Sequence, residues 1–369
     1  MRTVLFCLFI GFSALNAALV DVYFSTRGEP AEGIYRAKFD DTKGTLSDIA
    51  VAMPMQGSNF LAFHPDKNIL YAAGKVDGQD AIIAMIVDGK GWLNILNAQP
   101  IEGGGAAHLS VHPSGKFLIA AQYGGGSTSV FPLGDNGWIK KQTARLKHTP
   151  EDPNQPMNRK GPHPHWTGFS PDGRFAFVPD LGLDEIVVYE VLENAPFLEP
   201  SSRAKSIAGG GPRHLRFSTD GKFVFLLNEL SLSVTTFAYD ADTGELTKMT
   251  TAPALTEEQK AGESFNTASE ILVHPNGQFV YSGNRGNDSV TAYRATPETG
   301  ELEVIEVEPI RGAWPRNINL DPSGQWLLAA GMHSNTISVF SIDPETGELQ
   351  YPRGRIYSIP RVNCILFND

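Results

Sequence analysis

Short hydrophobic runs separated by turn-forming residues repeat along the whole chain. In the stretch 161–191, a brief apolar segment at 166–169 is followed by the turn Ser-Pro-Asp-Gly at 170–173 and by two apolar runs at 175–179 and 186–191. These runs are rich in β-branched and aromatic residues, which favour strands. The proline of the turn fixes φ, and its Asp-Gly pair supplies the positive φ that a tight hairpin needs. The stretch therefore predicts three short antiparallel strands.

The same unit, marked by its turn, occurs six times. The second residues of these turns lie at positions 65, 113, 171, 219, 275 and 322, with separations of 48, 58, 48, 56 and 47 residues. A period near 50 that is composed of short strands is typical of a β-propeller, in which each repeat is one four-stranded blade. The sequence thus predicts six blades directly. Because a propeller is a single closed array, one domain can take up a chain of this length.

A seventh blade is predicted to combine the two ends of the chain. The runs 19–26 and 33–39 resemble the second and third strands of a blade that lacks its inner strand. Residues 360–366 repeat the register of 315–320 and can supply that strand. We therefore predict an all-β, seven-bladed propeller whose C-terminal strand joins the N-terminal blade and closes the ring, which removes free strand edges.

The first 17 residues have the features of a secretory signal peptide. One cation, Arg2, precedes an apolar core at 4–12 and small residues at 15–17, and the apolar core is too short to span a membrane. We expect residues 1–17 to be removed, residues 18–369 to form one propeller domain, and the protein to be exported to the periplasm or the extracellular space.

Cysteine content and charge limit the other classes of chemistry and partner. Without the signal peptide, Cys364 is the single cysteine, and we expect it to be a small buried residue rather than a nucleophile. The formal net charge is −11, and an acidic surface argues against nucleic acid and anionic membranes as partners. We expect a small-molecule ligand and a monomeric protein.

The order of strands within a blade determines which residues meet at one mouth of the central channel. The inner strand runs along the channel, the following turn lies at the far end, and the second strand returns to the first end. Residues that lead into inner strands should therefore meet residues that follow second strands. The first kind comprises His163, His165, Arg213, His214, Glu270 and Arg316. The second kind comprises Tyr123, Asp180, Glu229, Arg285 and His333.

Several mouth residues also have purely structural interpretations. His163 can orient its own loop, Asp180 can cap the loop that follows it, and Arg285 can pair with Asp288 inside its turn. The alternative role of Glu270 is only to brace a neighbouring side chain, Arg213 or His214.

The histidines of the opposite turns, at 64, 112 and 274, are expected to bond backbone groups. Histidine spacings match no zinc motif, and no Lys-Ser/Thr follows the three glycine triplets, so we expect neither a metal nor a cofactor. Two junctions, 148–160 and 252–265, are longer than the others, and long loops in compact folds are usually functional rims or lids, or else flexible excursions.

The blade motifs resemble those of a known family. They are HPSGKFLIAAQYGGGSTSVFPL at 112–133, SPDGRFAFVPDLGLDEIVVYEV at 170–191, SEILVHPNGQFVYSGNRGNDSVTAY at 269–293 and IPRVNCILF at 359–367. The chain is similar over nearly its whole mature length to the seven-bladed β-propeller lactonases, which include 6-phosphogluconolactonases and fungal carboxy-cis,cis-muconate cyclases. Departures from the usual pattern at Gln122 and at 331–333 leave the substrate open.

The resemblance implies hydrolysis of a sugar-derived or carboxylated lactone. The family's proposed catalytic His, Arg, Glu and Arg fall on His165, Arg213, Glu229 and Arg285. The His-Glu pair would activate water, the first arginine would stabilise the oxyanion, and the second would hold a carboxylate or phosphate. Candidate substrate-binding residues are His163, His214, Glu270, Tyr123, Asp180 and His333.

Three other functions stay open at this point. The same residues can catalyse the cyclase reaction, in which a carboxylate adds to an alkene. A non-catalytic binding propeller would need exposed aromatic loops, and the candidates Trp92, Trp138 and Trp314 can equally belong to the core. A calcium-dependent lactonase of the regucalcin type would need several carboxylates at the channel, whereas this mouth is rich in histidine and arginine.

Overall fold

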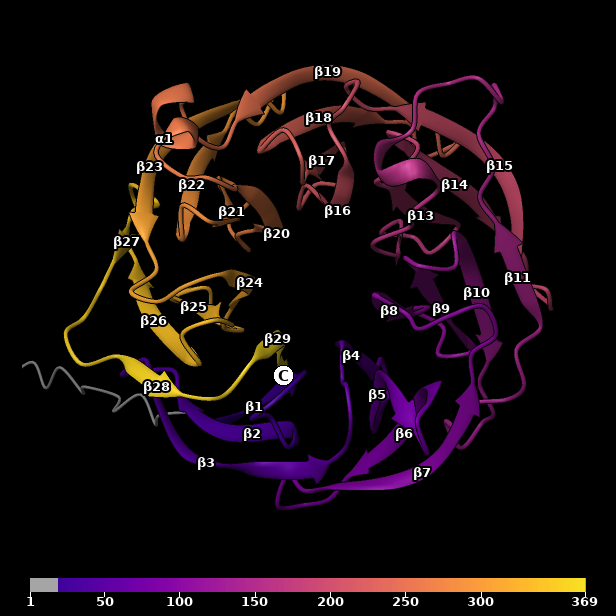
Figure 1. Cartoon of the computed structure of the whole chain (residues 1–369), viewed down its shortest axis with the longest axis horizontal. Helices are drawn as coiled ribbons and strands as arrows, with labels where there is room; N and C mark the ends of the chain where they lie inside the picture. Colours follow the sequence, from indigo (N-terminus) through magenta and orange to yellow (C-terminus); the bar gives the residue numbers. More distant parts are fainter. Residues whose placement is uncertain (1–18, 369) are drawn as a thin grey trace, which may run out of the picture.

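Seven antiparallel sheets surround a central channel in the computed structural model, which describes residues 19–368 (Figure 1). In each sheet the strands follow one another outward from the channel in chain order. The exception is the N-terminal blade, whose inner strand is the last strand of the chain. The predicted seven-bladed propeller and its closure by the C-terminal strand are therefore confirmed. The proposed signal peptide lies outside the described residues.

The strands group into blades as follows. The N-terminal blade contains β29 (Val362–Asn368), β1 (Leu19–Thr26), β2 (Gly33–Asp40) and β3 (Thr45–Pro54). The second contains β4 (Phe60–His64), β5 (Lys67–Val76), β6 (Gln79–Val87) and β7 (Leu93–Pro100). The third contains β8 (His108–Val111), β9 (Phe117–Gln122), β10 (Ser127–Pro132) and β11 (Ala144–Lys147). The fourth contains β12 (Gly168–Phe169), β13 (Phe175–Asp180), β14 (Glu185–Val191) and β15 (Leu198–Lys205).

The remaining blades have the same order. The fifth contains β16 (Pro212–Phe217), β17 (Phe223–Asn228), β18 (Ser233–Tyr239) and β19 (Leu246–Pro253). The sixth contains β20 (Thr267–Val273), β21 (Phe279–Arg285), β22 (Ser289–Ala295) and β23 (Leu302–Pro309). The seventh contains β24 (Pro315–Leu320), β25 (Trp326–Gly331) and β26 (Thr336–Ile342), with β27 (Leu349–Gln350) and β28 (Ile356–Ser358) both paired to β26.

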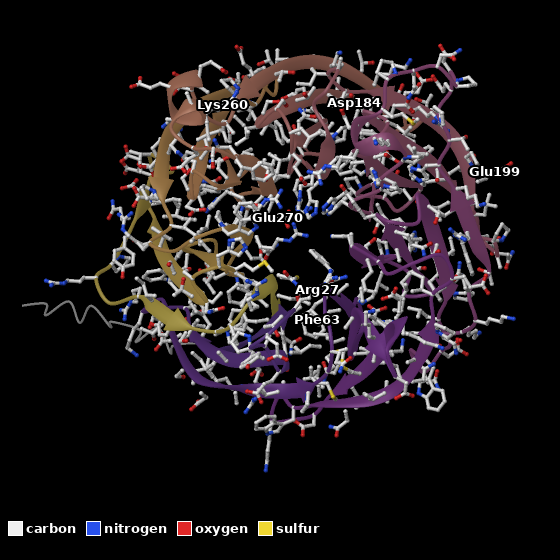
Figure 2. All side chains as sticks on the ribbon, viewed as in Figure 1. Arg27, Phe63, Asp184, Glu199, Lys260 and Glu270 are labelled. Carbon is white, nitrogen blue, oxygen red and sulfur yellow. The ribbon has the colours of Figure 1, made fainter. Side chains whose placement is uncertain are left out.

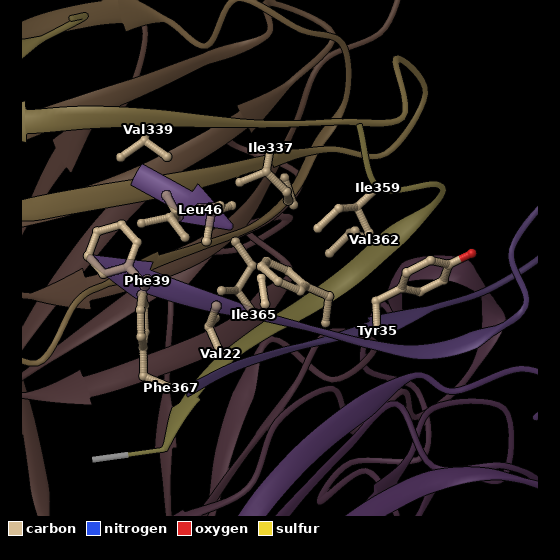
Figure 3. Close-up of a cluster of buried hydrophobic side chains, with 14 residues drawn as sticks. Val22, Tyr35, Phe39, Leu46, Ile337, Val339, Ile359, Val362, Ile365 and Phe367 are labelled. Atoms are coloured by element: carbon tan, nitrogen blue, oxygen red, sulfur yellow. The ribbon is translucent and has the colours of Figure 1, made fainter. Parts of the chain in front are cut away.

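Ring closure depends on hydrogen bonds and on a shared apolar cluster. Strand β29 pairs antiparallel with β1, with Phe24 opposite Ile365. The neighbouring blade also contacts this strand, because the Asn319 side-chain amide donates to the Ile365 carbonyl at 2.8 Å. Phe39, Ile337 and other side chains from both blades are buried together (Figure 3). Each such side chain contributes about 1.5–3 kcal/mol when it is fully buried, so the final strand is a major stabilising element.

The turns at the far end of the channel hold adjacent blades together. His112 Nε2 lies 2.9 Å from the Gly173 carbonyl of the next blade, and His274 Nε2 lies 2.7 Å from the Gly324 carbonyl. His64 Nδ1 accepts a hydrogen bond from the backbone N–H of Asp66 within its own turn. The prediction that these histidines bond backbone groups is confirmed.

The burial of one cysteine and two tryptophans tests the sequence analysis. Cys364 is buried, as predicted, and burial raises the pKa of its thiol to about 12. Of the two positions left open for Trp92 and Trp138, the core is excluded, because these residues are 37% and 48% exposed on turns between outer strands. A guanidinium, that of Arg36, lies 4.0 Å above the ring of Trp92.

The two long junctions contain the helical segments. The 3₁₀ helix η1 (Asn158–Lys160) ends the first junction, and α1 (Glu257–Ala261) lies in the second, where Thr256 and Gln259 form a capping box. Both junctions place a side chain at the channel mouth, Arg159 and Phe265 respectively. None of the helices within residues 19–368 has the length and hydropathy needed to span a bilayer.

Candidate active site

A cavity of about 740 Å³ occupies the channel mouth that strand polarity predicted. Figure 2 shows that Arg27 and Glu270 lie near the central opening, whereas Glu199 and Lys260 lie at the periphery. Among the described residues, the cations that line the cavity are Arg27, Lys75, Arg159, Arg213, Arg285, Arg316 and Arg361, and the carboxylates that line it are Asp80 and Glu229. The cavity is therefore strongly cationic in a chain whose net charge is −11. This arrangement favours an anionic ligand.

Glu229, which directly follows β17, is the shared partner of three arginines. Its Oε2 accepts a hydrogen bond from Arg213 Nε at 2.8 Å, and its Oε1 lies 3.2 Å from Arg285 Nη2 and 3.3 Å from Arg159 Nη2. Burial opposes the ionisation of Glu229, but the arginines outweigh it and hold the pKa of this carboxyl below its ordinary value. We call Glu229 with its three arginines the paired wall.

A chain of buried groups fixes the orientation of Arg213. Glu270 Oε1 lies 2.9 Å from His214 Nδ1, and His214 Nε2 lies 3.0 Å from Arg213 Nη1. Burial and the adjacent arginine lower the pKa of His214 well below its ordinary value, so the ring is neutral. Arginine has no acceptor, so His214 carries its proton on Nδ1 and accepts at Nε2. The hydrogen bonds of Arg213 within residues 19–368 use Nε and Nη1, which leaves Nη2 for a ligand in the cavity.

His165, which precedes β12, lies against the paired wall as a neutral base. Its Nε2 is 3.9 Å from Glu229 Oε2, and its Nδ1 is buried without a hydrogen-bond partner within the described part of the chain. Burial, and to a smaller extent the nearby Arg213, lower the pKa of His165 well below its ordinary value. The neutral imidazole has a nitrogen lone pair that can take a proton from water, and the Glu229 carboxylate favours the imidazolium that this would form.

The long junction before the fourth blade is tied to the cavity by ring stacking. Arg159 Nη1 donates to the Tyr123 hydroxyl at 3.2 Å, and the Tyr123 ring stacks on His163 with centroids 4.5 Å apart. The two ring nitrogens of His163 face the carbonyls of Tyr123 and Arg159, at 2.8 and 3.1 Å. These contacts fit the interpretation of His163 as a residue that orients its loop.

Asp180 and Glu270 lie behind the lining of the cavity rather than in it. Asp180 Oδ1 accepts from the backbone N–H groups of His163, Gly182 and Leu183, and its Oδ2 lies 2.8 Å from His148 Nδ1. These contacts match the alternative in which Asp180 caps its own loop. Glu270 likewise braces His214, as the second alternative stated.

The alternative pairing of Arg285 with Asp288 is wrong. Arg285 contacts Glu229 and donates to the Ala268 carbonyl at 2.6 Å. Asp288 Oδ1 instead accepts from the backbone N–H groups of Gly286 and Trp314. Burial lowers the pKa of Arg285 to about 10, and the Glu229 carboxylate partly offsets this effect.

A second set of cations lines the cavity without forming ion pairs within the described residues. Arg316 is the second residue of β24, Arg361 precedes β29, and Arg27 follows β1, so these three residues belong to the seventh and N-terminal blades. Within residues 19–368, none of the three forms an ion pair, and Arg361 Nε is buried without a hydrogen-bond partner. Burial, followed by Arg213 and Arg285, lowers the pKa of Arg316 well below its ordinary value. We call Arg27, Arg316 and Arg361 the unpaired wall.

The structure thus separates the predicted mouth residues into two groups. Those that line the cavity are His165, Arg213, Glu229, Arg285, Arg316, His214, Tyr123 and His333, and those behind it are His163, Asp180 and Glu270. Lining cations absent from the predicted site are Arg27, Lys75, Arg159 and Arg361. Arg27 follows a second strand and Arg361 occupies the position of Arg316 in a repeated Pro-Arg pair, so both satisfy the rule that found the others.

The donor set also bears on metal binding. No group of three or more His, Cys, Asp and Glu side chains within residues 19–368 is arranged to hold a metal ion. The two lining carboxylates, Asp80 and Glu229, already contact Lys75 and arginines. The expectation of a metal-free site stays a prediction.

The fold and the site define a closed seven-bladed propeller with a cationic, histidine-containing cavity at one mouth. The family model described as "Lactonase, 7-bladed beta-propeller" matches residues 21–367, so the chain belongs to this family, as the resemblance predicted.

Individual relatives agree with this assignment. A 6-phosphogluconolactonase of Bacillus subtilis is 30% identical over 79% of this chain and 82% of its own length. A 6-phosphogluconolactonase of Formosa agariphila is 33% identical over 80% of this chain and 84% of its own length. The solved structure of a periplasmic gluconolactonase from Pseudomonas aeruginosa is 25% identical, has a TM-score of 0.81, and matches 95% of this chain and 99% of that one.

Proposed function

We propose that this protein is a lactonase that hydrolyses a lactone bearing an anionic group. The observation that carries the proposal is the cavity itself, in which a neutral imidazole, an arginine with one free N–H pair and three unpaired cations face one space. The names of the relatives, 6-phosphogluconolactonase and gluconolactonase, support a sugar-derived lactone.

In the proposed mechanism, His165 takes a proton from a water molecule as the water oxygen attacks the lactone carbonyl carbon. Arg213 Nη2 donates to the oxyanion of the tetrahedral intermediate, where one such donor typically contributes a factor of about 10²–10³. Collapse of the intermediate breaks the ring C–O bond, and the protonated His165 returns its proton to the leaving oxygen. Glu229 aligns the arginines and favours the imidazolium that forms transiently.

The unpaired wall is proposed to hold the anionic substituent of the substrate. Arg285 was expected to do so, but its charge is already shared with Glu229 at 3.2 Å. Arg316 has no such partner among the described residues, and its guanidinium fork suits a carboxylate or a phosphate. A phosphorylated sugar lactone satisfies this requirement and agrees with the names of the sequence relatives.

The test is hydrolysis by the purified mature protein, followed as acid release at constant pH, with 6-phosphogluconolactone, a carboxylated lactone and glucono-δ-lactone as substrates. We expect the highest kcat/KM for an anionic lactone and equal rates with and without a chelator. Hydrolysis of none of the three would contradict the proposal, and a chelator-sensitive rate would favour a metal-dependent mechanism. The reverse reaction with a carboxylated muconate tests the cyclase alternative.

Export is also part of the proposal, supported by the sequence of residues 1–17 and by a periplasmic structural relative. Terminal sequencing of native protein should give a mature N-terminus near residue 18, and an intact Met1 would contradict export. Light scattering of the same sample tests the expected monomer.

A further inference from the structure

Three nearly parallel rings line the cavity beside the paired wall. The Trp314 ring stacks with Phe265 at a centroid distance of 6.0 Å and with His333 at 4.8 Å, in both cases with an interplanar angle of 13°. All three residues line the cavity, and the Arg285 guanidinium carbon lies 5.4 Å from the Trp314 ring centroid. We call these three rings the aromatic ledge. The proposed catalytic steps do not use it.

The backbone holds the ledge in a defined position. Trp314 has φ of +63°, a left-handed conformation that is unfavourable for a bulky residue, and its N–H donates to Asp288 Oδ1 at 2.7 Å. Gly286 has φ of +92°, and a Cβ at this position would lie 1.9 Å from the Phe265 carbonyl oxygen. Only glycine therefore allows the loop that carries Phe265 to approach the end of β21. Strained residues of this kind concentrate at functional sites.

The outer end of the ledge is open. Phe265 is 55% exposed, although the junction that carries it ends directly at β20, next to the paired wall. An exposed phenyl ring in a concave site gains stability when a flat, weakly polar surface covers it. Phe265 lines the same cavity as the arginines, and Arg285 lies over the next ring of the ledge, that of Trp314, so a ligand that covers Phe265 would bring an anionic group toward the arginines.

We propose that the aromatic ledge is a binding subsite for a flat ring in a ligand whose anionic group is held by the cavity arginines. That this ligand is the substrate rests on the proposed function, whereas the binding of the ligand to the ledge does not. An aryl ring and the C–H face of a pyranose both provide the required surface. The stack would gain a fourth member, and Arg285 would link ring recognition to the reaction centre.

The experiment measures binding by titration calorimetry with two non-hydrolysable probes, 3-phenylpropanoate for the aryl ring and glucose 6-phosphate for the pyranose. Phe265→Ala should weaken the binding of at least one probe by roughly three- to tenfold, the size of one aromatic contact. Phe265→Trp should restore it, whereas Phe265→Leu should not. Trp138→Ala removes an exposed ring that does not line the cavity and should leave both affinities unchanged.

The outcomes separate this proposal from the proposed function. Phe265-dependent binding without hydrolysis of any lactone would support the ledge and contradict the lactonase. Lactone hydrolysis with equal affinities of parent and Phe265→Ala for both probes would overturn the ledge, as would failure of the parent to bind either probe at millimolar concentration. A loss for 3-phenylpropanoate alone assigns the subsite to aryl rings, and a loss for glucose 6-phosphate alone assigns it to sugars.

Discussion

The two walls of the cavity contain the same residue type in opposite electrostatic situations. On the paired wall, one carboxylate binds three guanidinium groups and fixes their geometry, whereas on the unpaired wall three guanidinium groups line the cavity without an ion-pair contact among the described residues. A paired arginine is a positioned donor whose charge is largely compensated. An unpaired one retains its capacity to attract an anion. The partner of an arginine, rather than its presence in the cavity, therefore indicates its function.

The largest effect is expected from removal of the carboxylate that the paired wall shares. Glu229→Gln leaves the buried Arg213 and Arg285 without a counter-charge, which should cost about 3–5 kcal/mol of unfolding free energy. It should also lower kcat/KM by more than about 10³, because the oxyanion donor loses its alignment. Urea unfolding and steady-state kinetics measure the two effects.

The matched control for that variant is Asp80→Asn, which removes the other lining carboxylate. Asp80 lies 3.6 Å from Lys75 Nζ, and both side chains are partly exposed, so its loss should change stability by less than about 1 kcal/mol. Equal effects of the two variants would show that the walls do not differ in the way described.

The next effect isolates the oxyanion donor. Arg213→Lys keeps the positive charge but cannot contact Glu229, His214 and a ligand at once, since lysine lacks the planar fork. We expect kcat to fall by about two to three orders of magnitude with little change in KM. Unchanged kcat in a variant that unfolds at the parental temperature would assign the oxyanion to another donor.

Substitution of an arginine on the unpaired wall should not lower stability, in contrast to Glu229→Gln. Arg316→Leu removes a half-buried cation that has no ion pair within residues 19–368 and that Arg213 and Arg285 repel, so the unfolding temperature should stay the same or rise. For an anionic lactone KM should increase about ten- to hundredfold, the value of one charge-assisted hydrogen bond, whereas a neutral lactone should be unaffected. Lys75→Leu removes an equal charge that has its own carboxylate, and its KM should change much less. Equal KM values for both lactones in Arg316→Leu would move the anion site elsewhere.

The sequence contained enough information for the fold and for most of the mouth. The period of the turns and the order of the strands placed His165, Arg213, Glu229 and Arg285 at one mouth of the channel. Both the period and the order follow from the repetition of the backbone unit alone. The same rule, applied to the N-terminal blade, reaches Arg27.

Other features could not be predicted in this way. Whether Asp180 and Glu270 face the cavity or support it from behind depends on side-chain hydrogen bonds to residues outside their own blade, His148 and Asn317. Arg159 and Phe265 lie in long junctions that have no repeat, so no register relates them to the mouth. The difference between the two walls could not be predicted either, because an ion pair is defined by the distance between two side chains, and no sequence motif specifies that distance.

The smallest predicted effect links the two walls through His165. Burial and the surrounding cations, among them Arg213 and Arg316, lower the pKa of His165 well below its ordinary value, so the acid limb of kcat/KM should lie below pH 6.5 in the parent. The base is active when neutral, and activity is lost as pH falls through that pKa. Arg316→Leu removes one cation, which favours the imidazolium and moves the limb to higher pH. A pH profile with a neutral lactone avoids the KM effect, and Lys75→Leu provides the charge control. An unshifted limb in Arg316→Leu would mean that His165 is not the titrating base or that the unpaired wall does not act on it.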